Sequence, residues 1–259
     1  MAQTDKNRYA SELVPIELLQ QPIDFPIATK IFAKNVIIKA PMTEMISTYD
    51  LNLPLKSGLP TEALINLYDK WNAGGAAVMV TGPMALTTRD LEGTGNMVVA
   101  KEVDTPLRRD LFKRLASTAT HGTLIFAQLL HPGRMAIKTS PEFKAVDMNK
   151  LSVDELKEIV ERYVFAARFT KDCGFNGVEI NVSMDFALAQ LVAAESNQRT
   201  DQYGGSLANR TRILFDVING IRDDIKDDDN FVVGLKLHSL NFEQQFEEKQ
   251  FAEFCKRLD

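Results

Sequence analysis

Five short apolar runs alternate with amphipathic segments, and this alternation constrains the fold more than any other feature of the chain. The runs predict strands over 35–40, 76–81, 124–129, 177–181 and 231–237. Continuous apolar runs of this length are typical of strands buried on both faces, as in a parallel sheet covered by helices. The segments between them predict helices over 61–73, 105–120, 152–173, 207–225 and 242–258. The sequence therefore predicts an α/β fold built from about five βα units.

Local signals mark where several of these helices begin and end. Thr105 precedes Pro106, the order expected at an N-cap followed by the first helical residue. Ser152 and Glu155 have the spacing of a capping box, and Gly174 follows the end of the same helix. These signals fix the register of the predicted helices.

Two architectures accommodate five βα units: an open doubly wound sheet and a (β/α)8 barrel. A dinucleotide-binding sheet carries G-x-G-x-x-G after its first strand, whereas this chain has Ala40-Pro41-Met42-Thr43 there. The longer connections also follow the strands, on the side where barrels place their chemistry. We therefore expect a (β/α)8 TIM-barrel type of fold. Only five units fit into 259 residues at this spacing, so the predicted barrel is incomplete, lacks strands six to eight, and forms one domain over 1–259.

Composition excludes several classes of function. The net charge of −5 gives no electrostatic footprint for a nucleic acid, and no apolar run approaches the roughly 20 residues of a membrane span. The first 22 residues lack the pattern of a secretory signal or a transit peptide, so we expect a cytoplasmic protein. Two cysteines without a C-x-x-C pair and three histidines without H-x-x-x-H spacing predict no metal site.

Residues 196–212, SNQRTDQYGGSLANRTR, form the most specific segment of the chain. Taken by its residue types alone, it reads as a solvated charged loop in which Ser206 caps the next helix. Four other motifs occur in a fixed order around it: APMT at 40–43, GGA at 74–76, QLLHPGR at 128–134 and GFNGVEI at 174–180. Together these motifs resemble the old yellow enzyme family of NADH:flavin oxidoreductases, over about residues 30–240.

This resemblance implies a (β/α)8 barrel with FMN at the carboxyl ends of the strands. NADH or NADPH would reduce the flavin, and hydride would then pass from flavin N5 to an electron-poor small molecule in a ping-pong reaction. The residues at the family's flavin-binding positions are Ala40, Pro41, Met42, Thr43, Pro83, Gln128 and Lys236. The side-chain amide of Gln128 suits the pyrimidine end of the ring because it offers both donor and acceptor. Lys236 stands where the family has arginine, so it keeps the charge but loses the planar fork.

The substrate side departs from the family pattern. The family binds the acceptor with a His-x-x-His or His-x-x-Asn pair and protonates it with a tyrosine two residues later. Here the matching positions are Asn181, Met184 and Phe186. Asn181 is the one candidate catalytic donor, while Met184 donates no hydrogen bond and Phe186 has no hydroxyl. The resemblance therefore implies impaired alkene reduction, with these three residues at the substrate position.

Two other interpretations stay open at this stage. The chain can be a non-catalytic, shortened relative that folds or acts only when a second copy or a partner chain covers the apolar edges of its open barrel. It can also be a barrel of different chemistry in which Met184 and Phe186 hold an apolar ligand. His131, in the turn HPGR, is interpreted as a structural histidine.

Overall fold

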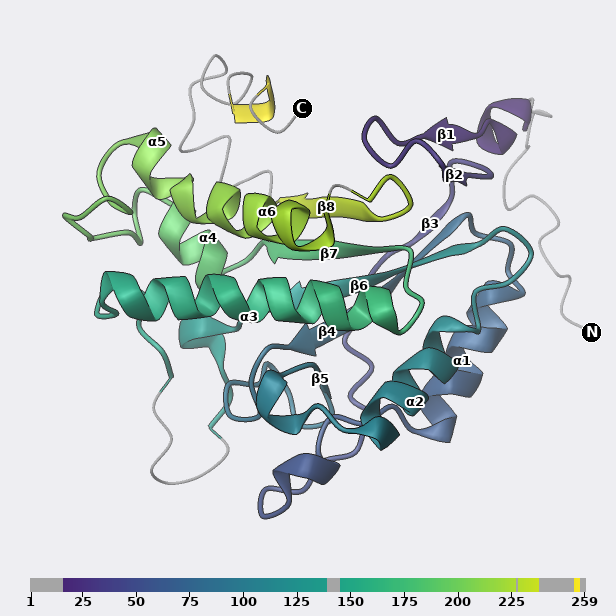
Figure 1. The fold of residues 1–259 in the computed structure, drawn as a ribbon, viewed down its shortest axis with the longest axis horizontal. Coiled ribbons are helices and arrows are strands. Elements are labelled where there is room, and N and C mark those ends of the chain that lie inside the picture. The colour runs from purple at the N-terminus through teal and green to yellow at the C-terminus, as the bar shows by residue number, and fades with distance from the viewer. Residues whose placement is uncertain (1–15, 139–144, 227, 238–253, 257–259) are drawn as a thin grey trace, which may run out of the picture.

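The structure, a computed structural model, describes residues 16–138, 145–226, 228–237 and 254–256. Within these residues a parallel sheet has the strand order β3-β4-β6-β7-β8, and the short β5 pairs with β4 (Figure 1). The strands are β3 (Ile38–Lys39), β4 (Val78–Ala85), β5 (Met97–Val98), β6 (Leu124–Leu130), β7 (Gly177–Val182) and β8 (Val232–Leu237). Strands that are neighbours in sequence are thus neighbours in the sheet, as in part of a (β/α)8 barrel. The predicted α/β fold of the TIM-barrel type is confirmed, with five barrel strands in the described residues.

The helices follow the strands in the predicted rhythm. They are α1 (Glu62–Asn72), α2 (Pro106–Ala116), α3 (Val153–Asp172), α4 (Ala187–Val192), α5 (Leu207–Arg210) and α6 (Arg212–Ile225). Short 3-10 helices lie at η1 (Glu17–Gln20), η2 (Pro54–Lys56), η3 (Lys101–Val103) and η4 (Gly133–Met135), and β1 (Ile23–Asp24) pairs with β2 (Phe32–Ala33) in a separate small sheet. None of the helices in the described part of the chain has the length and apolar character that a membrane span needs.

The predicted caps are present. The Thr105 side chain accepts a hydrogen bond from the Arg108 backbone at the start of α2. Ser152 and Glu155 form both hydrogen bonds of the capping box that begins α3. These caps satisfy amide groups that a helix start would otherwise leave without partners.

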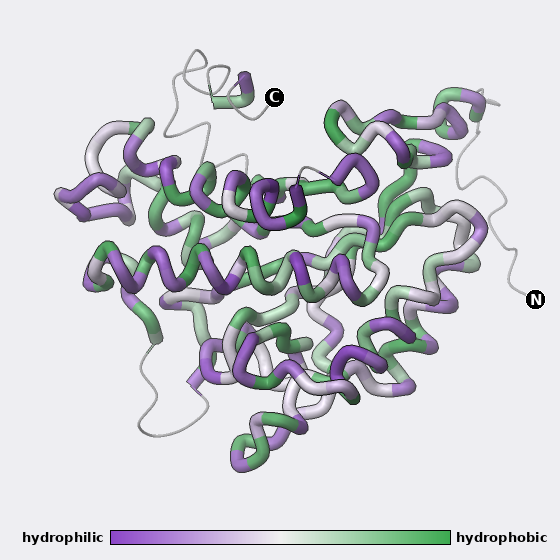
Figure 2. Tube along the Cα trace, in the orientation of Figure 1, coloured by the Kyte–Doolittle hydropathy of each residue, from purple (hydrophilic) through white to green (hydrophobic). Residues whose placement is uncertain are grey.

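The sheet separates two apolar cores. Side chains alternate between its faces, so Ile125, Ala127 and Leu129 of β6 pack in the large core, whereas Leu124 and Phe126 pack in a smaller one. The large core also contains the apolar sides of α1, α2, α3 and α6, whose other sides are hydrophilic (Figure 2). The smaller core lies on the opposite face of the sheet, which is the inner face of the partial barrel.

Two predictions about elements need correction, and a third is not tested. Residues 35–40 were expected to be a buried strand, but Ile37 and Ile38 are about half exposed because β3 has one neighbouring strand in the described residues. The helix predicted over 207–225 is divided at Thr211, whose hydroxyl donates back to the Leu207 carbonyl at 2.9 Å. The predicted helix over 242–258 lies almost wholly outside the described residues.

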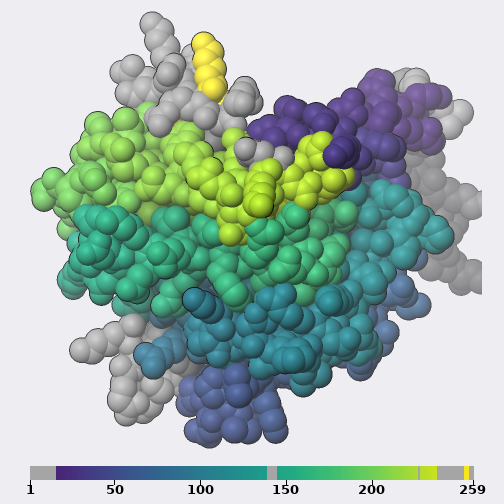
Figure 3. Space-filling model, in the orientation of Figure 1, coloured from purple at the N-terminus to yellow at the C-terminus, as the bar shows by residue number. Residues whose placement is uncertain are grey.

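The first and last described strands of the barrel face each other across an apolar cavity of about 380 Å³. Ile38 of β3, residues 232–235 of β8 and residues 25–28, which follow β1, line it. Lys30 joins the connection between β1 and β2 to the turn before β8 through an ion pair with Asp229 at 2.9 Å. The region of β1 and β2 and the end of α6 with the turn before β8 therefore lie side by side, purple against yellow-green in Figure 3.

Candidate active site

Polar side chains from three neighbouring strands share the inner face of the sheet. Gln128 of β6 is paired in register with Pro83 of β4 on one side and with Glu179 of β7 on the other. Asn181 lies two residues after Glu179 on the same face and is paired with Lys236 of β8. Register thus brings four predicted site residues, Pro83, Gln128, Asn181 and Lys236, to one face near the carboxyl ends of the strands.

Pro83 lies differently from its predicted position after the second strand. It is a buried residue within β4, which continues to Ala85. A register shift between Val80 and Pro83 marks a bulge, which lets the strand continue past a residue that cannot donate a hydrogen bond. The bulge places Pro83 directly beside Gln128.

Hydrogen bonds join the polar residues of this face in one direction. Ser183 donates its hydroxyl to Asn181 Oδ1 at 2.7 Å, and Asn181 Nδ2 donates to Gln128 Oε1 at 3.2 Å. Gln128 Nε2 then donates to Glu179 Oε1 at 2.6 Å. Gln128 and Asn181 are each only 2% exposed, so these partners matter for their burial. Each amide retains one N–H for another group, and the Gln128 carbonyl oxygen also keeps one lone pair, whereas Asn181 Oδ1 accepts from both the backbone N–H and the hydroxyl of Ser183.

Glu179 is the carboxylate at the end of this series. Burial raises the pKa of Glu179, while the hydrogen bond from Gln128 and the positive charge of Lys236 oppose the rise. Glu179 also lines the apolar cavity, next to Gly234 of β8. Lys236 therefore faces a negative partner on the inner face, in addition to any group that enters the open barrel.

The predicted ring-binding loop, residues 40–43, follows β3 at the rim of the same face. Thr43 does not point its hydroxyl freely into the site: it donates to Glu92 Oε1 at 3.0 Å. Glu92 is also held by Asn96, whose side-chain amide donates to its other carboxylate oxygen at 3.2 Å. Ala40 and Met42 are exposed, and Pro41 is half-buried.

Glu44 attaches this loop to β4 from the helix side. Its carboxylate accepts hydrogen bonds from the Gly82 backbone at 3.0 Å and from the Tyr68 hydroxyl. Gly82 is required there because a Cβ atom would lie 1.9 Å from Glu44 Oε2 and 2.2 Å from the Met42 carbonyl oxygen. Lys39 completes the cluster, with its ammonium over the Trp71 ring at 4.0 Å. Burial lowers the pKa of Lys39 to about 8.

The predicted substrate residues are separated by the turn that follows β7. Met184 is 56% exposed and has a positive φ of 55°, in the left-handed region of backbone conformation. Phe186 is buried at the N-cap of α4. Asn181 is hydrogen-bonded to Gln128 at 3.2 Å.

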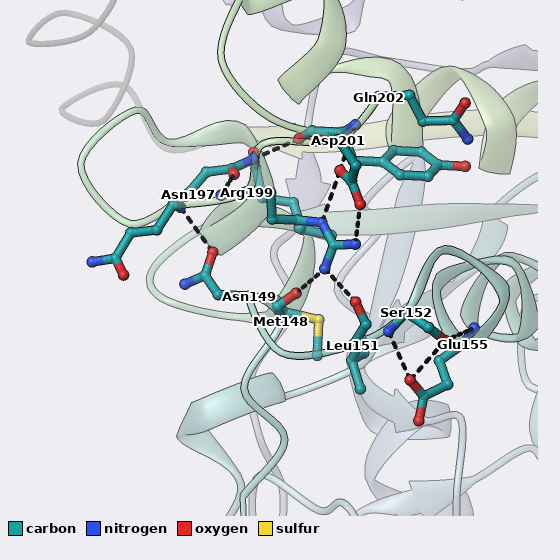
Figure 4. A network of polar contacts seen from close by, with 12 residues as sticks. Met148, Asn149, Leu151, Ser152, Glu155, Asn197, Arg199, Asp201 and Gln202 are labelled. Carbon is teal, nitrogen blue, oxygen red and sulfur yellow. Dashed lines mark hydrogen bonds and ion pairs between the residues drawn. The ribbon is translucent and has the colours of Figure 1, made fainter.

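The specific segment 196–212 is only partly solvated: Arg199 and Arg210 are buried, whereas Gln202 and Arg212 are exposed. The Arg199 guanidinium donates to the carbonyl oxygens of Met148 and Leu151, each at 2.7 Å, and pairs with Asp201 (Figure 4). Arg210 is also buried and donates to the Val192 carbonyl at 2.9 Å. These hydrogen bonds connect the segment before α3 to the connection after β7. The two guanidinium groups thus bind backbone carbonyl oxygens of the protein. Ser206 caps α5, as predicted.

His131 has the structural surroundings that its turn predicts. The backbone N–H of Gly133 donates to His131 Nδ1 at 3.1 Å, and burial lowers the pKa of the imidazole to about 4. A neutral ring is required for this hydrogen bond. Elsewhere in the described residues, no group of three His, Cys, Asp or Glu side chains is arranged to hold a metal ion.

The order of these motifs agrees with one known family. Residues 19–257 match the family model described as NADH:flavin oxidoreductase / NADH oxidase. The chain belongs to this family. It is 31% identical to the NADH-dependent flavin oxidoreductase nadA of Aspergillus parasiticus, over 90% of the chain and 56% of that protein. It is 28% identical to the flavin oxidoreductase hxnT of Emericella nidulans, over 86% of the chain and 61% of that protein.

Solved structures of the family share the fold. The old yellow enzyme homologue from Zymomonas mobilis is 25% identical, with a TM-score of 0.69 over 84% of this chain and 62% of that one. A 2-naphthoyl-CoA reductase complex gives a TM-score of 0.72 at 23% identity, over 85% of this chain and 35% of that one. The chain thus spans about half the length of the curated relatives it matches.

The donor set of the inner face fits the ring of a flavin. Two buried amides, a cation on β8 and the apolar ring of Pro83 share the inner face of the sheet, and an isoalloxazine offers matching polar edges and apolar faces. The resemblance places the phosphate-binding loops of the family after its last two strands, seven and eight, and β8 is the fifth barrel strand of the described residues. These residues therefore match the ring and not the phosphate.

Three residues near this site were not predicted from the sequence: Glu44, Glu92 and Glu179. Glu179 has a signal that was available, since a carboxylate inside an apolar strand run needs a buried partner. Glu44 and Glu92 lie in loops, and nothing in their local sequence indicates which strand or hydroxyl they contact.

Proposed function

We propose that the chain contributes the ring-binding part of an FMN-dependent NADH or NADPH oxidoreductase of the old yellow enzyme type, acting on a small electron-poor molecule. One observation carries the proposal: Gln128, Asn181 and Lys236, on three successive strands, share one face beside the 40–43 loop. Family membership and the flavin oxidoreductase names of the relatives support the same assignment.

The residues have separate roles in this proposal. FMN bound there supplies hydride transfer between the nicotinamide and the acceptor. Gln128 offers its remaining N–H and acceptor capacity to the pyrimidine edge of the ring. Lys236 places a positive charge on the same face, which favours the reduced and negatively charged ring. Residues 40–43 cover the edge of the ring that faces the rim.

On the acceptor side, Asn181 is the proposed donor. One of its amide protons is used by Gln128, so one N–H is left to bind a carbonyl or nitro oxygen. The Phe186 side chain has no hydroxyl to supply a proton. Loss of one oxyanion-type donor costs about 10²–10³ in rate, and loss of a general acid about 10²–10⁴. We therefore propose slow alkene reduction, with other electron acceptors reduced more readily.

A second candidate function rests on a different observation. Ile37 and Ile38 are about half exposed, and in the described residues β3 and β8 each pair with one barrel strand. Open apolar strand edges favour pairing with further strands. In this alternative the chain acts without catalysis of its own and is completed by a second copy or a partner chain.

Anaerobic reduction separates the two candidates. The purified chain is loaded with FMN, NADH or NADPH is added, and the flavin absorbance is followed. The proposed oxidoreductase predicts bleaching, whereas a chain that leaves the flavin oxidised acts in the second way. For the acceptor side, the double variant Asn181→His with Phe186→Tyr is expected to reduce an enone at least tenfold faster than the unmodified chain, and Phe186→Leu serves as the control. An enone rate that stays unchanged would contradict the placement of these residues.

A further inference from the structure

We propose that Glu179 is a positioning residue that fixes the orientation of the Gln128 side-chain amide and, through it, of the polar atoms that Gln128 and Asn181 present to the open barrel. The consequence for flavin binding rests on the proposed function. The orientation itself does not, because it is a property of the protein alone.

The carboxylate determines which end of the amide faces it. An ionised carboxylate only accepts hydrogen bonds, so the amide group 2.6 Å away must turn its NH₂ toward Glu179. The Gln128 carbonyl oxygen then points to the other side, where Asn181 Nδ2 lies at 3.2 Å. The reverse orientation would bring the Gln128 oxygen against the carboxylate and its NH₂ against another NH₂.

Ser183 fixes the opposite end of the same series. Its backbone N–H and its hydroxyl both donate to Asn181 Oδ1, at 3.0 and 2.7 Å. Asn181 must therefore present its NH₂ to Gln128. Ser183 and Glu179 therefore require the same order of donors and acceptors, from Ser183 through Asn181 and Gln128 to Glu179. Hydrogen bonds arranged in such a series strengthen one another in a buried site.

The residues paired with Glu179 in the sheet leave its carboxylate to the Gln128 amide. Its register partner on β6 is Gln128, and its partner on β8 is Gly234, which has no side chain to compete for the carboxylate. Burial raises the pKa of Glu179, and the hydrogen bond from Gln128 and the positive charge of Lys236 oppose that rise. A residue without an acceptor at position 179 leaves the buried NH₂ of Gln128 without its partner and lets the amide turn.

Side-chain amide NMR of the full chain without FMN tests the orientation. The chain is labelled with ¹⁵N-glutamine and ¹⁵N-asparagine, and Gln128→Leu and Asn181→Leu assign the two NH₂ groups. In the unmodified chain the Gln128 NH₂ is expected to exchange with solvent at least tenfold more slowly than a free glutamine side chain. Exchange at the free rate would overturn the proposal without any variant of Glu179.

Two variants separate the acceptor from the charge and from general stability. Glu179→Leu removes the acceptor and is expected to speed Gln128 NH₂ exchange about tenfold and to shift the Asn181 NH₂ signals. Glu179→Gln keeps an acceptor and is expected to stay within about twofold of the unmodified chain. Glu158→Leu, at an exposed position of α3, is the matched control and is expected to change neither signal. Equal perturbation by Gln and Leu, or none by Leu, would overturn the proposal.

FMN titration then tests the consequence. Glu179→Leu is expected to weaken FMN binding about tenfold to a hundredfold and Glu179→Gln to restore it to within about threefold. If the unmodified chain does not bind FMN, the proposed function fails while the NMR result still decides the role of Glu179. If the chain binds FMN and Glu179→Leu binds it equally well, the positioning role fails alone.

Discussion

The hydroxyl of Thr43 donates a hydrogen bond to the Glu92 carboxylate at 3.0 Å. The side chain that family resemblance assigns to the flavin edge is therefore turned toward a protein acceptor from the connection after β4. Glu92 keeps its own orientation through Asn96. The hydroxyl oxygen can still accept a hydrogen bond, but its proton is committed.

Replacing Glu92 is expected to release that proton. Glu92→Ala should strengthen FMN binding about fivefold, because the Thr43 hydroxyl becomes able to donate to the flavin and a neutral hydrogen bond contributes about 1 kcal/mol. Fluorescence titration with FMN measures the effect. In a Thr43→Val background, Glu92→Ala should have no further effect on FMN affinity, and an equal gain in both backgrounds would contradict the coupling.

A substitution of Lys236 is expected to change the affinity for FMN as well. Lys236→Arg restores the planar guanidinium that the family has at this position and should tighten FMN binding about tenfold, since a fork places two N–H groups on one polar edge. Lys70→Arg, at an exposed position of α1, is the control and should leave the dissociation constant unchanged. Weaker binding by Lys236→Arg would show that β8 does not face the ring.

Arg108 is expected to be a major determinant of stability. Its guanidinium is fully buried and donates to the backbone carbonyl oxygens of Leu55, Ser57, Gly58, Val98 and Val103. Arg108→Ala removes these bonds and leaves a cavity, so the free energy of unfolding should fall by about 3–5 kcal/mol. Urea unfolding measures the change. Arg114→Ala breaks an exposed ion pair with Glu62 and should cost less than about 1 kcal/mol.

The pH dependence of stability should contain a contribution from His131. Burial lowers its pKa to about 4 from the ordinary 6.5, so the folded ring stays neutral while the unfolded ring takes a proton. The unfolded state binds more protons in this interval, and the free energy of unfolding should fall by roughly 3 kcal/mol as pH drops from about 6.5 to 4. Urea unfolding at a series of pH values should show a shallower slope for His131→Asn, and identical slopes would contradict the assignment.

Local sequence predicted the elements well because their signals are local. The Ser152–Glu155 capping box, the Thr105 cap and the apolar runs of β6 and β7 each indicate their structure without knowledge of distant residues. The expected burial of 35–40 was wrong because burial of a strand depends on its neighbours. Ile38 faces the cavity beside β8, and its exposure follows from the open sheet.

The candidate site was predicted in part. Resemblance named Gln128 and Lys236, and register brings both to one face. It did not indicate Glu179, whose role depends on the pairing of β6 with β7, or Arg108, whose acceptors come from separate segments of the chain. The charges of 196–212 were expected to face solvent, yet Arg199 binds backbone carbonyls, because a buried guanidinium can satisfy several of them at once.

FMN binding by the full chain and by Gln128→Leu tests the central claim most directly. Titration of the apoprotein with FMN, followed by flavin fluorescence, should give saturable quenching with one site per chain. Gln128→Leu removes the amide that we propose binds the pyrimidine edge and should weaken binding at least tenfold. Equal affinity in both proteins, or no saturable binding to the unmodified chain, would contradict a flavin site on the inner face of this sheet.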